Sequence, residues 1–221
     1  GGLSLKKRLV LISTVALLIG FWFFIKLDVF SIFWPIIGSI TLGWLIVPLF
    51  VLVMLFIYSG GIIDGLDGLS GGVFAIIFGA YSVIAFSNNQ IDLAAFCALL
   101  VGAILAFLWF NIPPARFYLT ETGSMALTLT LTVVAFMTDS LGGGKGLFVL
   151  PIVALPLVLT TLSVIVQVGS KKFRNGKKIF LSTPIHHHFE AIGWPAYKVT
   201  MRYWVITFIF ATLGVLYALV I

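Results

Sequence analysis

The chain consists of long apolar runs separated by short polar segments. Runs of about 17 to 25 apolar residues are long enough to cross a bilayer as helices, and because lipid offers the backbone no hydrogen-bond partners, such runs are expected to be helical. The pattern predicts an all-α polytopic membrane bundle with about seven transmembrane helices. The predicted spans are Leu9 to Leu27, Phe33 to Ile57, Gly71 to Ser87, Ile91 to Phe110, Gly123 to Asp139, Leu147 to Val168 and Tyr203 to Ile221.

The runs are expected to form a single membrane domain over residues 1-221. No repeat, low-complexity tract or linker divides the chain. The first run follows three basic residues and resembles a signal peptide, but it lacks an A-x-A-like end and more spans follow, so we expect a retained helix.

The basic residues fall mainly in alternate loops. Of the 13 Lys and Arg residues, only Lys26 and Lys145 lie on the minor side of the predicted topology. Because cytoplasmic loops carry an excess of Lys and Arg, the major side is expected to be cytoplasmic. The predicted cytoplasmic loops are 59-70, 111-122 and 169-202.

Composition agrees with a membrane protein, since 61% of the residues are hydrophobic, only 9% are charged and the mean hydropathy is +1.20. The net charge is +6. The basic residues flank apolar spans, which favours membrane lipids with anionic headgroups or phosphorylated substrates as partners, and no nucleic acid. The single cysteine, Cys97, excludes an intrachain disulfide and a cysteine-based zinc site.

The first cytoplasmic loop carries Asp64 and Asp67 in a glycine-rich stretch. Carboxylates at a membrane boundary are costly and are functional candidates. In helical geometry the two lie one turn apart on one face and could share a cation. Oxygen ligands of this kind suit Mg²⁺ or Mn²⁺. The competing interpretation is that both only cap the following helix.

The second cytoplasmic loop adds Asn111 and Glu121 as further oxygen ligands. Two prolines end one helix, and Thr122 is a candidate cap for the next, whose free N–H groups would suit a phosphate oxygen. Tyr118 could stack on a base or simply anchor the loop at the membrane interface.

The third cytoplasmic loop contains five Lys and Arg residues followed by His186, His187 and His188. Consecutive side chains of a helix fan out, so one or two of these imidazoles can reach a common site. Imidazoles suit proton transfer, phosphate binding or metal ligation. Surface histidines without a role are the competing interpretation.

Carboxylates beside a basic loop would repel a phosphorylated substrate unless a divalent cation lay between them. This combination predicts metal-assisted phosphoryl transfer. Because the polar site is expected at the edge of a membrane bundle, one substrate should be a lipid. A cation transporter is disfavoured, since ionisable residues lie at one edge rather than deep within the spans.

Three motifs resemble the phospho-N-acetylmuramoyl-pentapeptide transferase family, within the polyprenyl-phosphate N-acetylhexosamine-1-phosphate transferase superfamily. They are Asp64 to Leu69, then Phe107 to Asn111 leading into Thr122 to Ser124, and finally Pro184 to Glu190 followed by Gly193 to Pro195. The His triplet is typical of this family among its relatives, and the resemblance extends over nearly the whole chain.

The resemblance implies Mg²⁺-dependent transfer of phospho-MurNAc-pentapeptide from UDP-MurNAc-pentapeptide to undecaprenyl phosphate, which gives lipid I and UMP in peptidoglycan synthesis. It also implies a homodimer in the bacterial inner membrane, with the active site facing the cytoplasm. Three sets of residues are implied: Asp64, Asp67 and His186 as catalytic, Gly65, Leu66, Asn111, Tyr118, His187 and His188 as substrate-binding, and Asp67 and Glu121 as metal ligands.

Several positions depart from the family pattern. Glu121 stands where the family has a Mg²⁺-binding aspartate, Gly61 replaces an asparagine, and Thr120 replaces a glycine. Thr160 or Thr161 replaces an acidic residue, and no Asp-Asp pair matches the family's upstream Asp-Asp-x-x-Lys motif. We therefore expect that about three N-terminal helices of the family's ten are missing. A truncated or divergent non-catalytic scaffold, or a transferase for another UDP-N-acetylhexosamine, remains an alternative.

Overall fold

The computed structural model describes residues 4–61, 63, 65–141 and 143–220. Almost all regular structure in this part of the chain is helical, which confirms the all-α fold class. The elements are α1 (Leu5–Lys26), β1 (Ser31–Trp34), β2 (Gly38–Thr41), the 3₁₀ helix η1 (Gly43–Leu45), α2 (Ile46–Gly61), α3 (Leu69–Ser87), α4 (Ile91–Asn111), α5 (Thr120–Ser140), α6 (Gly146–Val153), α7 (Leu155–Phe173), α8 (Ile185–Ala191) and α9 (Ala196–Val220).

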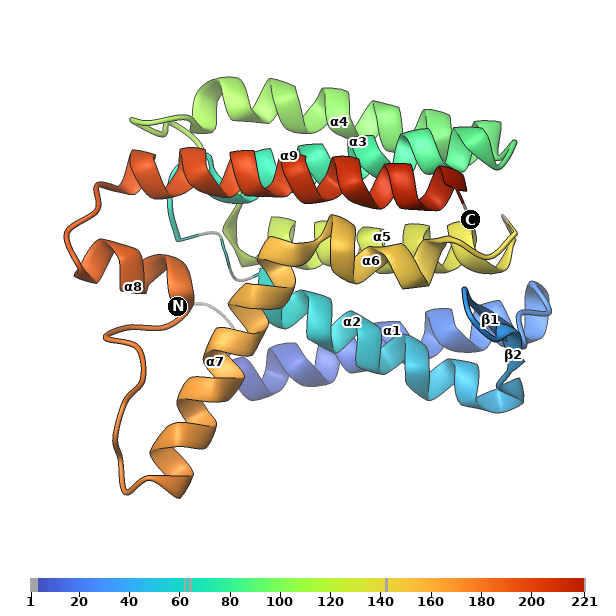
Figure 1. Cartoon of the computed structure of the whole chain (residues 1–221), viewed down its shortest axis with the longest axis horizontal. Helices are drawn as coiled ribbons and strands as arrows, with labels where there is room; N and C mark the ends of the chain where they lie inside the picture. The colour runs from blue at the N-terminus through green and yellow to red at the C-terminus, as the bar shows by residue number, and fades with distance from the viewer. Residues whose placement is uncertain (1–3, 62, 64, 142, 221) are drawn as a thin grey trace.

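The helices run back and forth, so that alternate connections meet at the same end of the bundle (Figure 1). One end holds α8 and the connections after α2 and α4, and we call it the α8 end. The opposite end holds the β1–β2 hairpin and the connections after α3 and α5, and we call it the hairpin end. The three predicted cytoplasmic loops therefore do lie at one end.

Each of the seven predicted spans contains an apolar helix, although α2 is a shorter one and α6 and α7 form a bent pair. Five helices, α1, α3, α4, α5 and α9, are long and apolar enough to cross a membrane, and a bent pair, α6 with α7, brings the number to six. The chain is therefore a multi-pass membrane protein, with the second and sixth predicted spans in need of correction.

The predicted span Phe33 to Ile57 is wrong in its first part, which forms an antiparallel hairpin. Trp34 pairs with Gly38 across the turn, and Gly38 has a φ of +83°. Pro35 cannot donate a hydrogen bond from its nitrogen, and a positive φ interrupts a right-handed helix, so helix cannot run through this stretch. Only the second part is helical, as α2.

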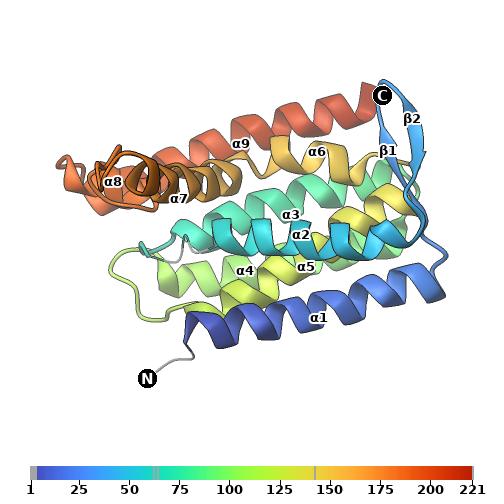
Figure 2. The same cartoon turned by 90° about the horizontal axis from the view of Figure 1, so that it is seen from below.

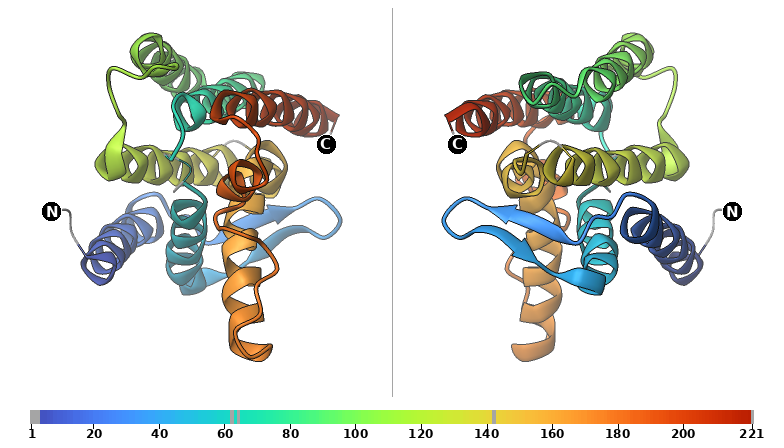
Figure 3. Two further views of the ribbon diagram at one scale, coloured as in Figure 1. Left: turned by 90° about the vertical axis from the view of Figure 1, so that its left-hand side faces the viewer. Right: turned by 90° about the vertical axis from the view of Figure 1, so that its right-hand side faces the viewer.

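The predicted span Leu147 to Val168 is broken into α6 and α7, which meet at an angle of 72°. Ala154 separates the two helices with φ −99° and ψ 27°, and Pro156 lies in the first turn of α7. Because proline lacks an N–H and its ring clashes with the carbonyl four residues earlier, the helix bends here. Figure 3 shows α7 leaving the bundle while α6 stays against it.

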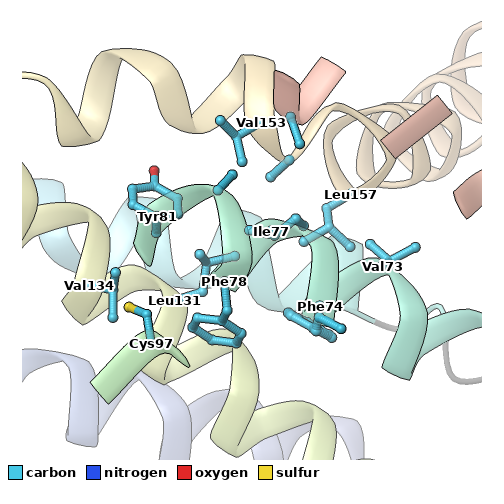
Figure 4. Close-up of a cluster of buried hydrophobic side chains, with 14 of the residues drawn as sticks. Val73, Phe74, Ile77, Phe78, Tyr81, Cys97, Leu131, Val134, Val153 and Leu157 are labelled. Carbon is cyan, nitrogen blue, oxygen red and sulfur yellow. The ribbon is translucent and has the colours of Figure 1, made fainter. Parts of the chain in front are cut away.

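The main hydrophobic core surrounds α3, which packs against α4 and α9. Phe74, Phe78 and Tyr81 of α3 are fully buried among side chains of α4, α5, α6 and α7 (Figure 4). A second cluster joins α1, α2 and α5 through Phe23, Phe50 and Phe136, the last two with ring centroids 4.7 Å apart. Figure 2 shows α1 at the outer side of the bundle, where α2 covers it.

Candidate functional site

The candidate site lies at the α8 end, where the segment after α2, the start of α5 and the helix α8 come together. Gly65 packs against the histidine helix, since a Cβ atom added to it would lie 2.9 Å from Nε2 of His187 and 3.3 Å from Nε2 of His186. The first and third predicted motifs are thus in direct contact. Asp64, a predicted catalytic residue, lies outside the described residues.

A cavity of about 210 Å³ brings together three of the predicted site residues, Gly65, Glu121 and His187. Its remaining lining residues are Arg8, Tyr58, Ser124 and Pro184. Arg8 of α1 forms an ion pair with Glu121 of α5 inside this lining. The cavity therefore joins one cation, one carboxylate and one imidazole, a set that suits an anionic, phosphorylated ligand.

The histidine triplet divides between two surroundings. His186 is fully buried, and within the described residues neither of its ring nitrogens has a hydrogen-bond partner. Burial, and next the charge of His187, lowers the pKa of His186 well below its usual value. His186 is therefore neutral at physiological pH.

His187 and His188 are held by different partners. Nδ1 of His187 lies 2.7 Å from Oε2 of Glu190, one turn further along the chain. Nδ1 of His188 accepts a hydrogen bond from the backbone N–H of Leu181 at 3.2 Å, and its ring contacts Phe180. His186 and His187 thus lie beside Gly65, whereas His188 packs against the segment that precedes α8.

Asp67 is bound to the second predicted loop. The backbone N–H of Ala115 donates to Oδ2 of Asp67 at 3.1 Å. Asn111 is buried, and it accepts from the N–H of Gly68 at 3.1 Å and donates to the carbonyl of Phe117 at 2.7 Å. The side chain of Asn111 thus links the two loops, and its predicted role in substrate binding stays a prediction.

Leu66 and Tyr118 differ in exposure. Leu66 is half-buried and packs against the main core, and its predicted role in substrate binding stays a prediction. Tyr118 is 67% exposed, which leaves its ring available for stacking.

The helix α5 starts earlier than the sequence predicted. It begins at Thr120, so Thr122 lies inside the first turn and is not a cap. Thr120 has a φ of +59°, a left-handed conformation that strongly favours glycine over a β-branched residue. Thr120 replaces a glycine of the family that the motifs resemble, and the backbone conformation at this position is one that favours glycine.

The predicted metal ligands have other partners in this structure. Glu121 is paired with Arg8, and one oxygen of Asp67 accepts from Ala115. The described residues contain no group of three or more His, Cys, Asp or Glu side chains placed to hold a metal ion. Mg²⁺ usually needs only one or two carboxylates plus phosphate and water oxygens. The donor chemistry of Asp67 and Glu121 fits it, and the metal stays a prediction.

Other residues of the site escaped sequence reasoning. In the sequence, Arg8 served only to assign the cytoplasmic side of the membrane. Thr200 and Trp204 of α9 were not predicted, and they donate hydrogen bonds to the carbonyls of Asp67 and Gly68. Thr160 and Thr161 are buried residues of α7, and the hydroxyl of Thr161 donates to the carbonyl of Phe56. The sequence signal for Trp204 was Gly72, because a Cβ atom at that position would lie 2.0 Å from Nε1 of the indole.

Comparison with known proteins agrees with the three motifs. Residues 1–139 match the family model described as glycosyl transferase family 4. A phospho-N-acetylmuramoyl-pentapeptide-transferase of Geobacillus sp. (strain WCH70) is 40% identical over 96% of this chain and 65% of the relative. The protein of the same name from Bacillus anthracis (strain A0248) is 38% identical over 97% of this chain and 64% of the relative.

The chain thus spans just under two thirds of the length of these curated relatives. The match to the family model covers more than half of the chain and includes the Asp67, Asn111 and Glu121 segments. The chain therefore belongs to glycosyl transferase family 4.

Proposed function

We propose that the protein transfers phospho-MurNAc-pentapeptide from UDP-MurNAc-pentapeptide to undecaprenyl phosphate, giving lipid I and UMP. The observation that carries the proposal is the single cavity shared by Gly65, Glu121 and His187, from three separate motifs of the chain. The names of the relatives supply the transferred group and the type of reaction. The apolar helices around the site support a lipid as acceptor.

The residues of the site suit the handling of a pyrophosphate. In the proposal, His187 donates to a phosphate oxygen, and Arg8 offsets part of the negative charge that enters the cavity. In the proposal, His186, which is neutral and buried, supports the loop at Gly65 and the ring of His187, with which its own ring is in contact. Tyr118 supplies an exposed ring for the uracil.

Mg²⁺ belongs to the proposal, with Asp67 and Glu121 as its protein ligands. When bound, the cation would neutralise charge on the pyrophosphate of the donor. Glu121 would have to exchange its Arg8 ion pair for the cation, and Arg8 would then be released toward the substrate.

We further propose that the α8 end faces the cytoplasm of a bacterial inner membrane. The basic residues at that end support this orientation, since they include all but two of the 13 Lys and Arg residues. A homodimer is also part of the proposal and rests on the family resemblance alone.

Release of UMP tests the proposal. Asp67→Asn should abolish Mg²⁺-dependent UMP release, and Asp64→Asn should impair it. Asp92→Asn, on the exposed first turn of α4 at the hairpin end, is the matched control. Because the chain spans 65% of the Geobacillus relative, the assay uses both the chain alone and the chain joined to the part of that relative that it does not match. Unchanged turnover of Asp67→Asn would reject the proposal.

A non-catalytic, lipid-binding scaffold is the second candidate function. The Arg8–Glu121 ion pair and the left-handed Thr120 favour it, because both depart from what a metal-binding loop needs. Absence of UMP release from both forms, with UDP-MurNAc-pentapeptide and with other UDP-N-acetylhexosamines, would support the scaffold. Release from another donor alone would correct the substrate.

A further inference from the structure

We infer that Thr200 and Trp204 of α9 are positioning residues, which hold the Asp67 carboxylate in place relative to the histidine helix. The inference rests on the proposed function for the role of Asp67. Its structural part rests on contacts that do not depend on that function.

The peptide groups on both sides of Gly68 are held from several elements. The hydroxyl of Thr200 donates to the carbonyl of Asp67 at 3.2 Å, and Nε1 of Trp204 donates to the carbonyl of Gly68 at 3.1 Å. Asn111 accepts from the N–H of Gly68, and the N–H of Ala115 donates to the carboxylate of Asp67. Asp67 and Gly68 thus accept three of these hydrogen bonds and donate one, with partners in α4, in the loop after it and in α9.

The indole of Trp204 packs against two glycines, Gly68 and Gly72. A Cβ atom at position 72 would lie 2.0 Å from Nε1 of Trp204, far inside contact distance. Gly68 has a φ of +74°, and a Cβ atom there would lie 3.6 Å from the same indole. Gly72 is therefore required by the tryptophan, whereas at Gly68 the positive φ is what favours glycine. The fold places Trp204 directly against the start of α3.

The segment just before α9 contacts the histidine helix. Trp194, just before α9, stacks on Phe189 of α8 with ring centroids 4.9 Å apart. The guanidinium of Arg202 lies 4.0 Å from the centre of the Trp194 ring, a cation–π contact. Residues 194–204 therefore contact α8 on one side and the Asp67 segment on the other, and set how the two lie relative to each other.

Loss of either donor should lower turnover more than substrate binding. Trp204→Phe keeps most of the ring but removes the N–H, and Thr200→Val removes the hydroxyl at nearly constant volume. A displacement of about 1 Å in a reacting group can cost about a hundredfold in rate. We expect kcat to fall at least about tenfold in each variant, with KM for the UDP donor nearly unchanged.

Hydrogen exchange at residues 65–72 measures the position directly, without activity. A neutral hydrogen bond contributes about 1 kcal/mol, so exchange at the Gly68 and Gly72 amides should become roughly fivefold faster in Trp204→Phe and Thr200→Val. Thr200→Ser keeps the hydroxyl and should restore wild-type exchange and kcat. Gly72→Ala, which displaces the indole, should reproduce Trp204→Phe.

Two control variants change the same residue types elsewhere. Thr212→Val removes a hydroxyl that donates only to the carbonyl four residues earlier on the exposed side of α9. Trp44→Phe changes an exposed tryptophan at the hairpin end. Both should leave exchange and kcat as in the wild type.

The two proposals fail in different ways. If the wild type releases UMP and the Trp204 and Thr200 variants keep kcat, the positioning role is overturned. Unchanged exchange at residues 65–72 in these variants would overturn its structural part. If the wild type releases no UMP from any UDP donor, the proposed function fails, while exchange still decides whether α9 holds the Asp67 segment.

Discussion

Asp139, next to last in α5, accepts a hydrogen bond at Oδ2 from the backbone N–H of Phe33, 106 residues earlier in the chain, with a donor–acceptor distance of 3.1 Å. Its Oδ1 accepts from the N–H of Leu147 at 3.1 Å. This one carboxylate is 2% exposed, and it joins the β1–β2 hairpin, α5 and the start of α6 at the hairpin end. The sequence indicated only that Asp139 ends a predicted membrane span.

Asp139→Asn should therefore lower the free energy of unfolding. Asparagine has one acceptor oxygen in place of two, so one of the two backbone N–H groups would face an amide N–H. An unsatisfied buried group costs about 1–3 kcal/mol. Thermal unfolding in detergent measures the change, with Asp92→Asn on the exposed start of α4 as the control. Equal melting temperatures for both variants would show that the carboxylate is not needed.

Gly65→Ala should disturb the histidine helix. The added Cβ atom would lie 2.9 Å from Nε2 of His187, so the imidazole must move or α8 must shift. We expect loss of UMP release by about tenfold or more, because the cavity lining is displaced. Gly102→Ala is the control, since a Cβ atom at position 102 meets nothing within 4 Å. Full activity of Gly65→Ala would mean that His187 does not act from the position described.

Thr120→Gly should stabilise the protein. Thr120 has a φ of +59°, and a β-branched residue in this region costs about 1–3 kcal/mol of local strain. Glycine removes that strain but adds freedom to the unfolded chain, so we expect a net gain of about 1 kcal/mol. Thr122→Gly, two residues further inside the helix, should instead destabilise by up to about 1 kcal/mol. The two melting temperatures should move in opposite directions, and a parallel shift would contradict the prediction.

His186 should make the protein less stable at acidic pH. Its pKa in the folded chain is lowered from 6.5 by burial and by His187. Below pH 6.5 the unfolded chain binds a proton that folded His186 does not, so the free energy of unfolding falls as the pH falls, by at most about 1.4 kcal/mol per pH unit. The loss begins near pH 6.5 and continues until the lower pKa of the folded state is reached.

His186→Phe removes this proton-binding group and keeps an aromatic ring in the buried position. The difference in stability between pH 7.5 and 5.5 should be smaller in the variant than in the wild type. The two proteins differ only at position 186, so the comparison isolates His186. An identical pH dependence would show that the folded and unfolded states bind a proton at His186 equally well.

The class of the protein and the side on which its motifs gather could be predicted from the sequence. Hydrophobic run length depends only on local composition, and successive crossings place alternate loops at the same end. The predicted loops lie at the same end although two spans differ from the prediction. The hairpin replaces only part of one run, and α6 with α7 still return the chain to the α8 end. Asp67, Asn111, Glu121 and the histidines were therefore correctly grouped.

The contacts within that group required the tertiary structure. Pro35 and Pro156 showed where a helix is interrupted, but not that one break makes a hairpin and the other a bend of 72°. Three contacts of the site join residues far apart in the chain. They are the contact of Gly65 with His187, the ion pair of Glu121 with Arg8, and the hydrogen bond from Trp204 to Gly68. Local pattern specifies elements and their order, whereas such contacts depend on how whole helices pack, and only the folded chain determines that.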